Sequence, residues 1–582
     1  MDFVAELSTL ISQETDLSTD IVKDFLEVPP QPELGDYALP CFKLAKTMRK
    51  APNLIAEELA EKMQPLPDYL TEVRQTGGYL NFFINRSRFI QDEITSILHS
   101  EQEPGVSDLG KGQTILVEFS SPNIAKPFHI GHGFTTILGE SLARIYDHLG
   151  YDTKRLNHLG DYGTQFGKLI VAYDRWGNEE ELLREPIDEL LRIYVKFHDE
   201  AEQEIDEKGV SILEKEAREA FQRLEAGAEH ETQLWSRFRE VSLIEFNRVY
   251  DRLGIKFDNL NGESFYSDQI PAVVEMLKEK NLLEESEGAQ VVRLDEFNLP
   301  PCIILKSDGT TIYASRDIAA VLYRDKTWNF NRNIYVVGLP QQLHFKQIFA
   351  VLKKAGEPCA DRCEHVGFGT VKFPDGALST RSGKVIKLDD LFAEAVKKTR
   401  QIIETNATER GDDMSAETID AIAEKVGLGA ILYIFLKNGR ERDIVFKWEE
   451  VLDFDGDTAP YLQYTYARAK SILRRANEVD ATADPSTLEL AAIENDTTFQ
   501  LVRAMADFPE AIQNAASANE PFMIARQINL IARLFNKFYN NDSILNIEDT
   551  NLRQSRLCLC RAVCRVLKTG LNLLGIEAVE KM

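Results

Sequence analysis

The stretch TILVEFSSPNIAKPFHIGHGFTTILGE, residues 114–140, decides the fold of this chain. Residues 114–120 are short, β-branched and apolar, which is typical of a buried parallel strand. A glycine-bearing turn leads into a helical pattern that ends at Gly150, and a second candidate strand, DTKRLNHLG, follows directly. Strand, turn, helix and strand in this order predict a doubly wound, Rossmann-like α/β domain.

The motif His129-Ile130-Gly131-His132 lies at the turn between the first strand and the helix. A helix N-terminus offers unpaired backbone N–H groups and a partial positive charge to a phosphate. Two imidazoles there can donate hydrogen bonds to oxygens that gain charge in a transition state, and Gly131 lets a nucleotide approach the backbone closely. The motif therefore predicts a nucleotide site at the carboxyl end of a strand.

Competing nucleotide motifs are missing from the sequence. GALSTRSGKV has six residues between its glycines and no Ser or Thr after the lysine, so it does not match a phosphate-binding loop. No GxGxxG follows a predicted strand, which disfavours a dinucleotide cofactor. His129 and His132 therefore remain the candidates for binding a nucleotide.

The rest of the chain suggests several domains, as expected for 582 residues. We expect a small α+β N-terminal domain, a catalytic domain with a helical insertion, a helical connector and an all-α C-terminal domain. Strand-like CIILKS and NIYVVGL continue the α/β pattern, and the chain after Leu388 reads as almost wholly helical. The expected boundaries are 1–108, 109–388 with the insertion at about 177–254, 389–456 and 457–582.

Composition bounds the class of protein. The chain is 43% hydrophobic and 28% charged, which is typical of soluble proteins with sizeable cores. It contains no run of roughly 18 uncharged apolar residues, and its first residues carry acids where a signal peptide would carry Lys or Arg. We therefore expect a cytoplasmic protein without a membrane partner.

The net charge of −27 at first argues against a nucleic-acid partner, because phosphate binding requires Lys and Arg. Residues 458–582, however, hold 14 Lys+Arg and 14 Asp+Glu, so all of the excess negative charge lies elsewhere. Helical spacing places Arg553, Arg556, Arg561 and Arg565 on common faces. By composition alone these arginines form either a solvated helix face or a nucleic-acid surface.

The seven cysteines do not predict a metal site or a disulfide framework. Cys359, Cys363 and His365 offer three potential ligands, whereas a closed zinc site requires four. The remaining cluster, Cys558, Cys560 and Cys564, lies in an apolar helical stretch where buried thiols are common. We expect no protein-bound structural metal.

Six blocks, spread in order over nearly the whole chain, resemble the class I aminoacyl-tRNA synthetases, and specifically the arginyl-tRNA synthetase family. VEFSSPNIAKPFHIGH is similar to that family's extended HIGH signature, and FDGDTAPYLQYTYARAKSIL to the entry of its anticodon-binding domain. The other blocks that resemble the family are GDYALPCFKLAK, NHLGDYGTQFGK, TIYASRDIAAV and VGLPQQLHFKQ.

The resemblance implies an arginine pocket. Glu118 and Asp317 would be carboxylates that face the guanidinium or the α-ammonium group, since a guanidinium pairs best with planar bidentate acceptors. The resemblance adds Asn123, Tyr313 and Gln341 to the pocket, with His132 close to both arginine and ATP. Without the resemblance, Asp317 would be read as the N-cap of a helix and Tyr313 as a core aromatic of a strand.

The second class I signature, usually KMSKS, departs from the family pattern here. The matching run is ALSTR, residues 377–381, so both signature lysines are missing. A lysine there would neutralise charge that develops on pyrophosphate. The resemblance implies that Lys126 takes this role, with Lys384 as a second candidate. It places ATP against His129, Gly131, His132, Ser379 and Lys384.

The implied reaction joins L-arginine to its tRNA in two steps that use ATP with Mg²⁺, and activation of arginine requires bound tRNA. Positioning and charge stabilisation, without a covalent protein nucleophile, supply the catalysis. Unpaired anticodon bases would stack on aromatic residues of the C-terminal domain. The expected tRNA contacts are Tyr461, Tyr464 and Arg468 there, with Asn81 and Phe83 in the N-terminal domain. We expect a monomer.

Three alternatives stay open on the residues. A glutamyl, glutaminyl or cysteinyl synthetase would share the fold, but two carboxylates in the pocket disfavour acidic or neutral substrates, and cysteine selection usually requires zinc. A small-molecule nucleotidyltransferase would share HxGH but would not need the C-terminal helices. A tRNA-binding relic without catalysis is disfavoured by His129 and His132.

Overall fold

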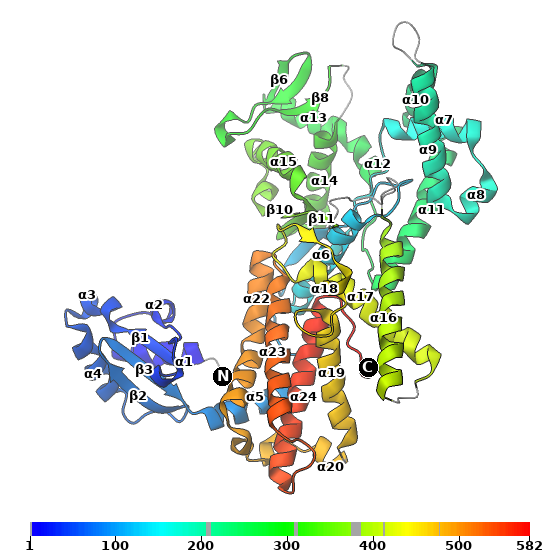
Figure 1. The fold of residues 1–582 in the computed structure, drawn as a ribbon. Helices are drawn as coiled ribbons and strands as arrows, with labels where there is room; N and C mark the ends of the chain where they lie inside the picture. The colour runs from blue at the N-terminus through cyan, green and yellow to red at the C-terminus, as the bar shows by residue number, and fades with distance from the viewer. Residues whose placement is uncertain (1–2, 205–210, 308–311, 374–385, 411–413, 477) are drawn as a thin grey trace. The chain divides into compact units, whose positions relative to one another are not determined.

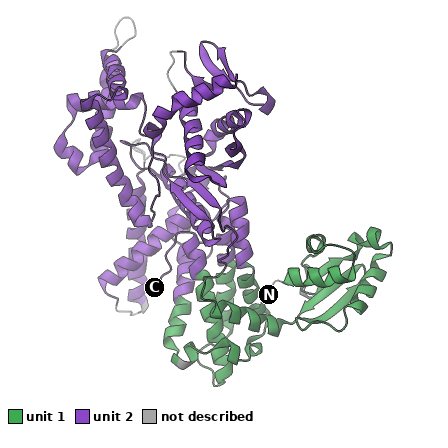
Figure 2. Ribbon diagram, turned by 180° about the vertical axis from the view of Figure 1, so that it is seen from behind, with its two compact units in different colours: residues 1–104, 468–507, 530–567 green, residues 105–467, 508–529, 568–582 purple. Residues whose placement is uncertain are grey.

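The computed structural model describes residues 3–204, 211–307, 312–373, 386–410, 414–476 and 478–582. The chain divides into two compact units, coloured separately in Figure 2. Unit 1 comprises residues 1–104, 468–507 and 530–567, and unit 2 comprises residues 105–467, 508–529 and 568–582. Three helices contribute residues to both units: α19 (Ala459–Arg475), α23 (Phe522–Asn541) and α24 (Thr550–Leu573).

Unit 2 contains the parallel sheet that the sequence predicts. Its strand order is β10-β9-β4-β5, and every neighbouring pair is parallel. Ile115, Leu116 and Val117 of β4 are fully buried, as expected for a strand inside a sheet covered on both faces. The strands are β4 (Thr114–Glu118), β5 (Asp152–Leu156), β9 (Arg332–Gly338) and β10 (Cys363–Phe368).

Helix α6 (Ile130–His148) connects β4 to β5, and α15 (Gln342–Lys354) connects β9 to β10 (Figure 1). Close packing of α6 requires a glycine, because a Cβ at Gly139 would lie 2.2 Å from the Cβ of Phe119. The sequence did not predict strand β10, because its segment CEHVGF contains the polar residues Glu364 and His365. The strand lies at the edge of the sheet. The Rossmann-like class of the catalytic region is confirmed.

The insertion is helical, as predicted. Its helices alternate apolar and charged residues with helical periodicity, so each buries one face against its neighbours; Leu190, Ile193 and Phe197 of α9, for example, are fully buried. Helix α7 (Thr164–Trp176) precedes it and packs on α9 and α10. The insertion consists of α8 (Glu179–Arg184), α9 (Pro186–Gln203), α10 (Ile212–Glu225) and α11 (Glu229–Leu253).

The predicted strand CIILKS exists, but it does not extend the parallel sheet. It forms β8 (Cys302–Leu305), which pairs antiparallel with β7 (Ala289–Val292), and β7 pairs antiparallel with β6 (Leu283–Ser286). This small sheet packs beside α13 (Ile270–Glu279) and α14 (Tyr313–Trp328) over one apolar core. The short α12 (Glu263–Tyr266) lies next to α14.

Beyond Leu388 the described residues of unit 2 are mainly helical, with one exception. Strand β12 (Ile444–Val445) pairs parallel with β11 (Val371–Lys372), so the helical expectation is wrong for these two residues. Long apolar faces pack α16 against α17, and α17 and α22 pack on α6. The helices are α16 (Leu388–Arg410), α17 (Ala416–Leu436), α18 (Trp448–Val451) and α22 (Phe508–Ala518).

The N-terminal part of unit 1 is a three-stranded antiparallel sheet in the order β1-β3-β2, covered by helices, which confirms the small α+β domain. Its turn at Gly77 has a φ of +61°, a conformation that glycine adopts without strain. Leu39, Leu59 and Phe82 are fully buried in its core. The elements are α1 (Phe3–Glu14), α2 (Thr19–Phe25), β1 (Tyr37–Pro40), α3 (Ala45–Met48), α4 (Pro52–Lys62), β2 (Leu70–Thr76) and β3 (Tyr79–Ile84).

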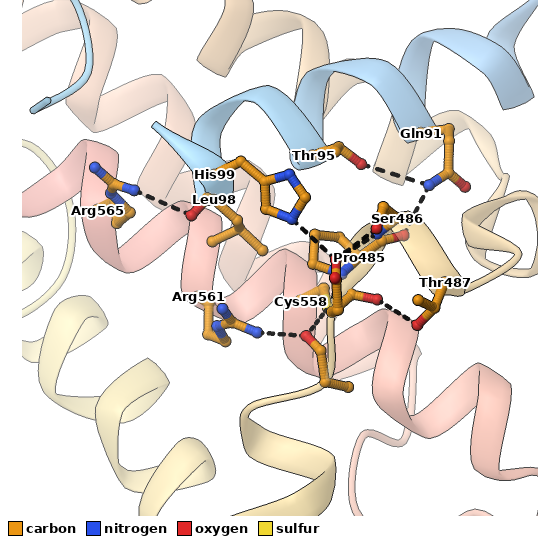
Figure 3. A network of polar contacts seen from close by, with 12 residues as sticks. Gln91, Thr95, Leu98, His99, Pro485, Ser486, Thr487, Cys558, Arg561 and Arg565 are labelled. Carbon is orange, nitrogen blue, oxygen red and sulfur yellow. Dashed lines mark hydrogen bonds and ion pairs between the residues drawn. The ribbon is translucent and has the colours of Figure 1, made fainter. Parts of the chain in front are cut away.

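Helix α5 (Arg86–His99) connects this small domain to the helices of unit 1. It packs on η7 (Pro485–Thr487), η8 (Leu490–Ile493) and α21 (Asp496–Ala506). Figure 3 shows Gln91 and His99 of α5 pointing toward Pro485 and Ser486. The remaining short elements are α20 (Glu478–Ala481), η1 (Pro32–Leu34), η2 (Cys41–Lys43), η3 (Ser267–Gln269), η4 (Asp295–Phe297), η5 (Leu339–Gln341) and η6 (Pro358–Arg362).

Candidate active site

The HIGH motif forms the N-terminus of α6. His129 is the N-cap residue, and its Nδ1 accepts a hydrogen bond of 3.1 Å from the backbone N–H of Gly131. The Nδ1 of His132 accepts one of 3.3 Å from the backbone N–H of His129, which completes a reciprocal capping box. A Cβ at Gly131 would lie 2.9 Å from Cε1 of His129, so the glycine is needed for this cap.

The two imidazoles are neutral and share one tautomer. Burial, followed by the charge of nearby Lys126, lowers the pKa of His129. Burial, followed by the charges of His129 and Lys126, lowers the pKa of His132 to about 3. Because each Nδ1 accepts a backbone N–H, each proton is assigned to Nε2. The rings stack with centroids 3.9 Å apart. The motif therefore presents two adjacent Nε2–H donors rather than two cations.

A cavity of about 280 Å³ adjoins the motif. On one side it is lined by the loop after β4, including Asn123 and Lys126, and by His129 and His132. On the other side it is lined by apolar and polar residues of the helices before and within the insertion, namely Gln165, Phe166, Leu169, Leu191 and Tyr194. The structure thus brings Asn123, Lys126, His129 and His132 together, as the sequence predicts for a common site.

Lys126 is exposed at the rim of this cavity. Within the described residues its side chain makes no hydrogen bond or ion pair, and its charge acts on both motif histidines. A flexible ammonium beside a helix N-terminus can bind phosphate oxygens. Lys384 and Ser379, the other two residues expected to contact ATP, lie outside the described residues.

The chain that follows the second signature returns to the HIGH motif. The backbone N–H of Leu388 donates to the carbonyl of Phe128 at 2.9 Å, and that of Ile130 donates to Ile386 at 3.3 Å. Residues 386–388 therefore lie antiparallel to the start of α6, with Lys387 opposite His129. Lys387 also pairs with Asp188 of the insertion at 2.6 Å.

Asp317 lies within α14 between two histidines. His344 Nε2 is 2.6 Å from Oδ2 of Asp317, and His158 Nε2 is 3.8 Å from Oδ1. Burial alone would raise the pKa of Asp317, but the His344 hydrogen bond and the nearby charges hold it below its ordinary value. Because α14 begins at Tyr313, Asp317 is not an N-cap, and that alternative is wrong.

The other predicted arginine contacts occupy different environments. Tyr313 is 57% exposed in the first turn of α14, so the reading as a strand core aromatic is wrong. Gln341 is exposed at the start of α15. Asn123 lies against Gly160, where any side chain would clash with its Oδ1. Whether these residues contact arginine stays a prediction.

Glu118 has a partner inside the protein. Its Oε2 lies 2.5 Å from Nη1 of Arg324, and Glu118 and Arg324 are only 5% and 1% exposed. Burial alone would lower the pKa of the Arg324 guanidinium, but Glu118 raises it well above its ordinary value, so the arginine stays charged. The sequence did not point to Arg324.

Other polar residues near Asp317 were also not expected. Glu263 is partly buried, and desolvation raises its pKa to about 7 against the opposing charge of Arg316. The Nε of Arg316 is 3.3 Å from Glu263, and its guanidinium lies 5.0 Å from the ring centres of Tyr162 and Tyr313. His158 and His344 lie in the quoted blocks NHLGDYGTQFGK and VGLPQQLHFKQ, which is the only pattern that could have found them.

The predicted tRNA contacts lie in two places. Tyr461, Tyr464 and Arg468 are partly buried on one face of α19, at a spacing of three and four residues. Arg468 lies over the ring of Tyr539 at 4.9 Å. In β3, Asn81 is 3% exposed, whereas Phe83 is partly exposed beneath Arg74, with 4.5 Å between guanidinium and ring centre. Their role in binding tRNA stays a prediction.

The described residues contain neither a metal-binding cluster nor a membrane-spanning helix. No group of three or more His, Cys, Asp or Glu side chains there could hold a metal ion. The Sγ of Cys363 lies 3.4 Å from the carbonyl oxygen of Cys359. In the same part of the chain, no helix is both long and apolar enough to cross a membrane.

The parallel sheet, the capped HIGH turn and the helical insertion define the catalytic domain of a class I aminoacyl-tRNA synthetase. Accordingly, the family model described as "tRNA synthetases class I (R), catalytic domain" matches residues 93–448. The model of the "Arginyl tRNA synthetase N terminal domain" matches residues 3–84, and that of the "DALR anticodon binding domain" matches residues 462–582.

Full-length relatives agree. Arginine–tRNA ligases of Clostridium beijerinckii and Clostridium botulinum are each 51% identical over 582 residues, covering all of both chains. The arginyl-tRNA synthetase structure of Thermus thermophilus superposes with a TM-score of 0.78 and 26% identity over 96% of each chain. That of Plasmodium falciparum gives 0.79 and 25%, over 100% of this chain and 99% of that one.

The chain belongs to the arginyl-tRNA synthetase family and is an arginine–tRNA ligase of class I. The family, fold and enzyme class that the sequence blocks predict are thereby confirmed. The class I family uses ATP, and the alternatives of another amino-acid specificity or a small nucleotidyltransferase are set aside by the three matching domains.

Proposed function

We propose that this ligase works in two steps and that the first requires bound tRNA. A carboxylate oxygen of L-arginine attacks the α-phosphorus of Mg-ATP, the bond to the β-phosphate breaks, and pyrophosphate leaves. A ribose hydroxyl of the tRNA's terminal adenosine then attacks the adenylate carbonyl, and AMP leaves. Both steps depend on positioning and charge stabilisation. Mg²⁺ enters with ATP as part of the substrate complex.

The capped HIGH turn carries this proposal. Its two neutral Nε2–H donors lie side by side at a helix N-terminus and line one cavity with Asn123 and Lys126. In our proposal His129 and His132 donate to phosphate oxygens as negative charge moves toward the leaving group. Gly131 leaves room for the nucleotide, because it carries no side chain above the helix end.

Lys126 takes over the work of the missing signature lysines in our proposal. It lies at the rim of the HIGH cavity, where its charge is strong enough to affect both motif histidines. Replacing Lys126 with Met should lower the rate of adenylate formation, with a smaller effect of Lys384→Met. The opposite ranking would assign the role to Lys384, and Ser379 would then bind ATP beside it.

Asp317 is the main acceptor for the substrate guanidinium in our proposal. It is ionised and partly buried, which suits a bidentate contact with a planar cation. Asn123, Tyr313 and Gln341 complete the arginine site, with His132 between arginine and ATP. Glu118 is the second carboxylate of this region.

For tRNA we propose two contact regions. Tyr461, Tyr464 and Arg468 share one face of α19 and would stack on and pair with anticodon nucleotides. Asn81 and Phe83 mark the N-terminal region that meets the outer corner of the tRNA. We further propose a cytoplasmic monomer, with domains at 1–108, 109–388, 389–456 and 457–582.

ATP–pyrophosphate exchange tests the proposal. Each amino acid is supplied in turn, with and without the cognate tRNA. We expect exchange with arginine only, and only when tRNA is present. Exchange without tRNA would contradict the tRNA requirement, and exchange with another amino acid would contradict the substrate. His129→Ala should lower the exchange rate by roughly 100-fold, as for loss of one transition-state donor, while the protein stays folded.

A further inference from the structure

We propose that Tyr146 and Asn519 are positioning residues that transmit the effect of tRNA binding from the C-terminal helices α23 and α24 to the HIGH turn. The inference deepens the proposed function and rests on its requirement for bound tRNA. Helix α6 is the connecting element. It presents His129 and His132 at its N-terminus, and further along it hydrogen-bonds to the connection before α23 and to the end of α24.

Four side chains close a ring of polar contacts beside the C-terminal half of α6. The Tyr146 hydroxyl accepts a hydrogen bond from Nη1 of Arg332 at 2.9 Å and donates to Oδ1 of Asn519 at 2.6 Å. Nδ2 of Asn519 donates to Oε1 of Glu364 at 2.7 Å, and Glu364 pairs with Arg332. Because each donor in the ring meets an acceptor, the contacts hold the four side chains in place relative to one another.

The contact between Tyr146 and Asn519 is buried. Tyr146 is only 1% exposed, and Asn519 is fully buried. The carbonyl oxygen of Ala516, in the last turn of α22, also lies 2.9 Å from the Tyr146 hydroxyl. Separating α6 from the connection between α22 and α23 would leave buried polar groups unpaired, which is costly. We therefore expect these two segments to move together.

A second contact joins α6 to the C-terminal end of α24. The hydroxyl of Ser141 donates to the carbonyl of Leu573 at 2.9 Å, and Nη1 of Arg144 donates to that of Asn572 at 3.1 Å. The last carbonyls of a helix have no partner within it, so these donors from α6 satisfy them. Helix α6 thus holds the end of α24 as well as the connection before α23.

The length of α6 connects these contacts with the catalytic motif. Tyr146 follows His132 by about four turns, which is roughly 21 Å along the helix axis. A helix is a stiff element, so a change of tilt imposed at Tyr146 would displace the imidazole donors at its N-terminus. In the other direction, α23 continues into unit 1, where its Tyr539 lies beneath Arg468, one of the proposed tRNA contacts. One hydrogen-bonded path therefore leads from that region to the HIGH turn.

The test compares the unmodified full chain with four variants. Tyr146→Phe removes the hydroxyl. Asn519→Gly removes the amide but keeps a backbone φ of +54°, which glycine adopts without strain. The double variant tests whether both changes break the same link. Tyr433→Phe is the matched control, because its hydroxyl is equally buried and lies 2.7 Å from Oδ1 of Asp457, but it belongs to α17 and not to α6.

Three quantities are measured for each protein: the Kd of cognate tRNA, the Kd of ATP without tRNA, and the rate of ATP–pyrophosphate exchange at saturating tRNA, arginine and ATP. We expect Tyr146→Phe and Asn519→Gly to lower the exchange rate by roughly 10-fold, within the range for variants along a coupling network. The double variant should lose no more than the weaker single variant. Neither Kd should rise by more than about twofold, because the tRNA surface and the HIGH turn keep their residues. Tyr433→Phe should leave all three quantities unchanged.

Four results would overturn the inference. The exchange rate could stay unchanged in both single variants, the two losses could multiply in the double variant, or Tyr433→Phe could lower the rate as much. The fourth is a lower rate with an equal loss of ATP or tRNA affinity, which would indicate local damage to one site. If Tyr146→Phe does not fold, Asn519→Gly and the control decide. Exchange by the unmodified chain without tRNA would instead overturn the proposed tRNA requirement, and the inference with it.

Discussion

Two polar networks in this molecule differ in how they treat charge. In unit 2, one network consists of Glu118, Arg324, His158 and Asp317. Its ion pair, between Glu118 and Arg324, is almost completely buried. In unit 1, Arg565 and Arg561 of α24 donate to backbone carbonyls, and His99 of α5 pairs with Asp484 at a site that is half exposed (Figure 3). The first network holds charges against one another, whereas the second mainly satisfies helix ends and turns.

The difference shows what each network can be used for. A buried charge is tolerated only when it is paired, so every residue of the buried network in unit 2 depends on its neighbours. An exposed pair keeps its solvation and contributes little. The buried network of unit 2 is therefore suited to orient a functional group. The partly exposed network of unit 1 is suited to hold segments of that unit together. This contrast predicts effects of very different size.

The largest effect should come from breaking the buried ion pair. Glu118→Gln or Arg324→Met alone should lower the free energy of unfolding by about 3–5 kcal/mol, because each leaves a buried charge without its partner. The double variant should recover most of this loss, since no uncompensated charge remains. Urea denaturation of the single and double variants measures it; additive losses would contradict a buried, coupled pair.

His132 should show the next largest effect, as a function of pH. Its pKa in the folded chain is about 3, below the ordinary value, because burial disfavours the imidazolium. The unfolded chain therefore takes up the proton first, so this contribution to stability is complete above about pH 6.5 and declines as the pH falls toward 3. Between pH 7 and 5 the loss should be about 1–2 kcal/mol.

Replacing His132 with Asn removes this titration. The free energy of unfolding of the variant should fall less between pH 7 and 5 than that of the unmodified chain, whatever its value at pH 7. Denaturation at several pH values gives the two slopes. Equal slopes would mean that His132 titrates normally in the folded state.

A moderate effect is expected at Arg565 in unit 1. Its guanidinium donates to the carbonyl oxygens of Ile97, in the last turn of α5, and of Ser100, both at 2.7 Å, and to that of Gln102 at 2.6 Å. Arg565→Met should lower the free energy of unfolding by about 0.5–1.5 kcal/mol, because the partly buried carbonyl of Ile97 loses a charged donor while the exposed carbonyls of Ser100 and Gln102 regain water. The KM of arginine should stay unchanged, because these hydrogen bonds go to backbone carbonyls of unit 1 and to no residue of the proposed arginine site.

The sequence predicted well the features that depend on residues close together along the chain. Residues 114–120 and the HIGH motif became β4 and the capped start of α6, because apolar runs and helix caps are local features. It also predicted that Asn123, Lys126, His129 and His132 share a site, and all four line one cavity. Their contacts with substrates remain predictions.

The buried network around Glu118 and Arg324 could not be predicted, because its residues are far apart in the sequence. His158 follows β5, Arg324 belongs to α14 and His344 to α15. Arg324 is followed by Asp325 and Lys326 and has the sequence context of an exposed helix residue. It is buried in the folded protein, where it contacts Glu118 of β4 and Tyr335 of β9. Likewise, Arg553 and Arg556 suggested a nucleic-acid surface or a solvated face, but both pair with carboxylates of their own unit, Asp480 and Asp542.

The smallest effect should come from the exposed pair of His99 and Asp484. Hydrogen bonds from Ser486, backbone N–H first, and then from His99 lower the pKa of Asp484 to about 2. Because the folded pKa lies below the ordinary value near 4, the ionised carboxylate supports folding above pH 4, and this support disappears between pH 4 and 2. His99→Asn should therefore leave the stability at pH 7 nearly unchanged, since Ser486 still donates to Asp484. Asp484→Asn should remove the acid-dependent part between pH 4 and 2, which denaturation at pH 4 and pH 2.5 can detect. If His99→Asn lowered the free energy of unfolding at pH 7 as much as Arg324→Met does, the distinction between the exposed network of unit 1 and the buried network of unit 2 would be contradicted.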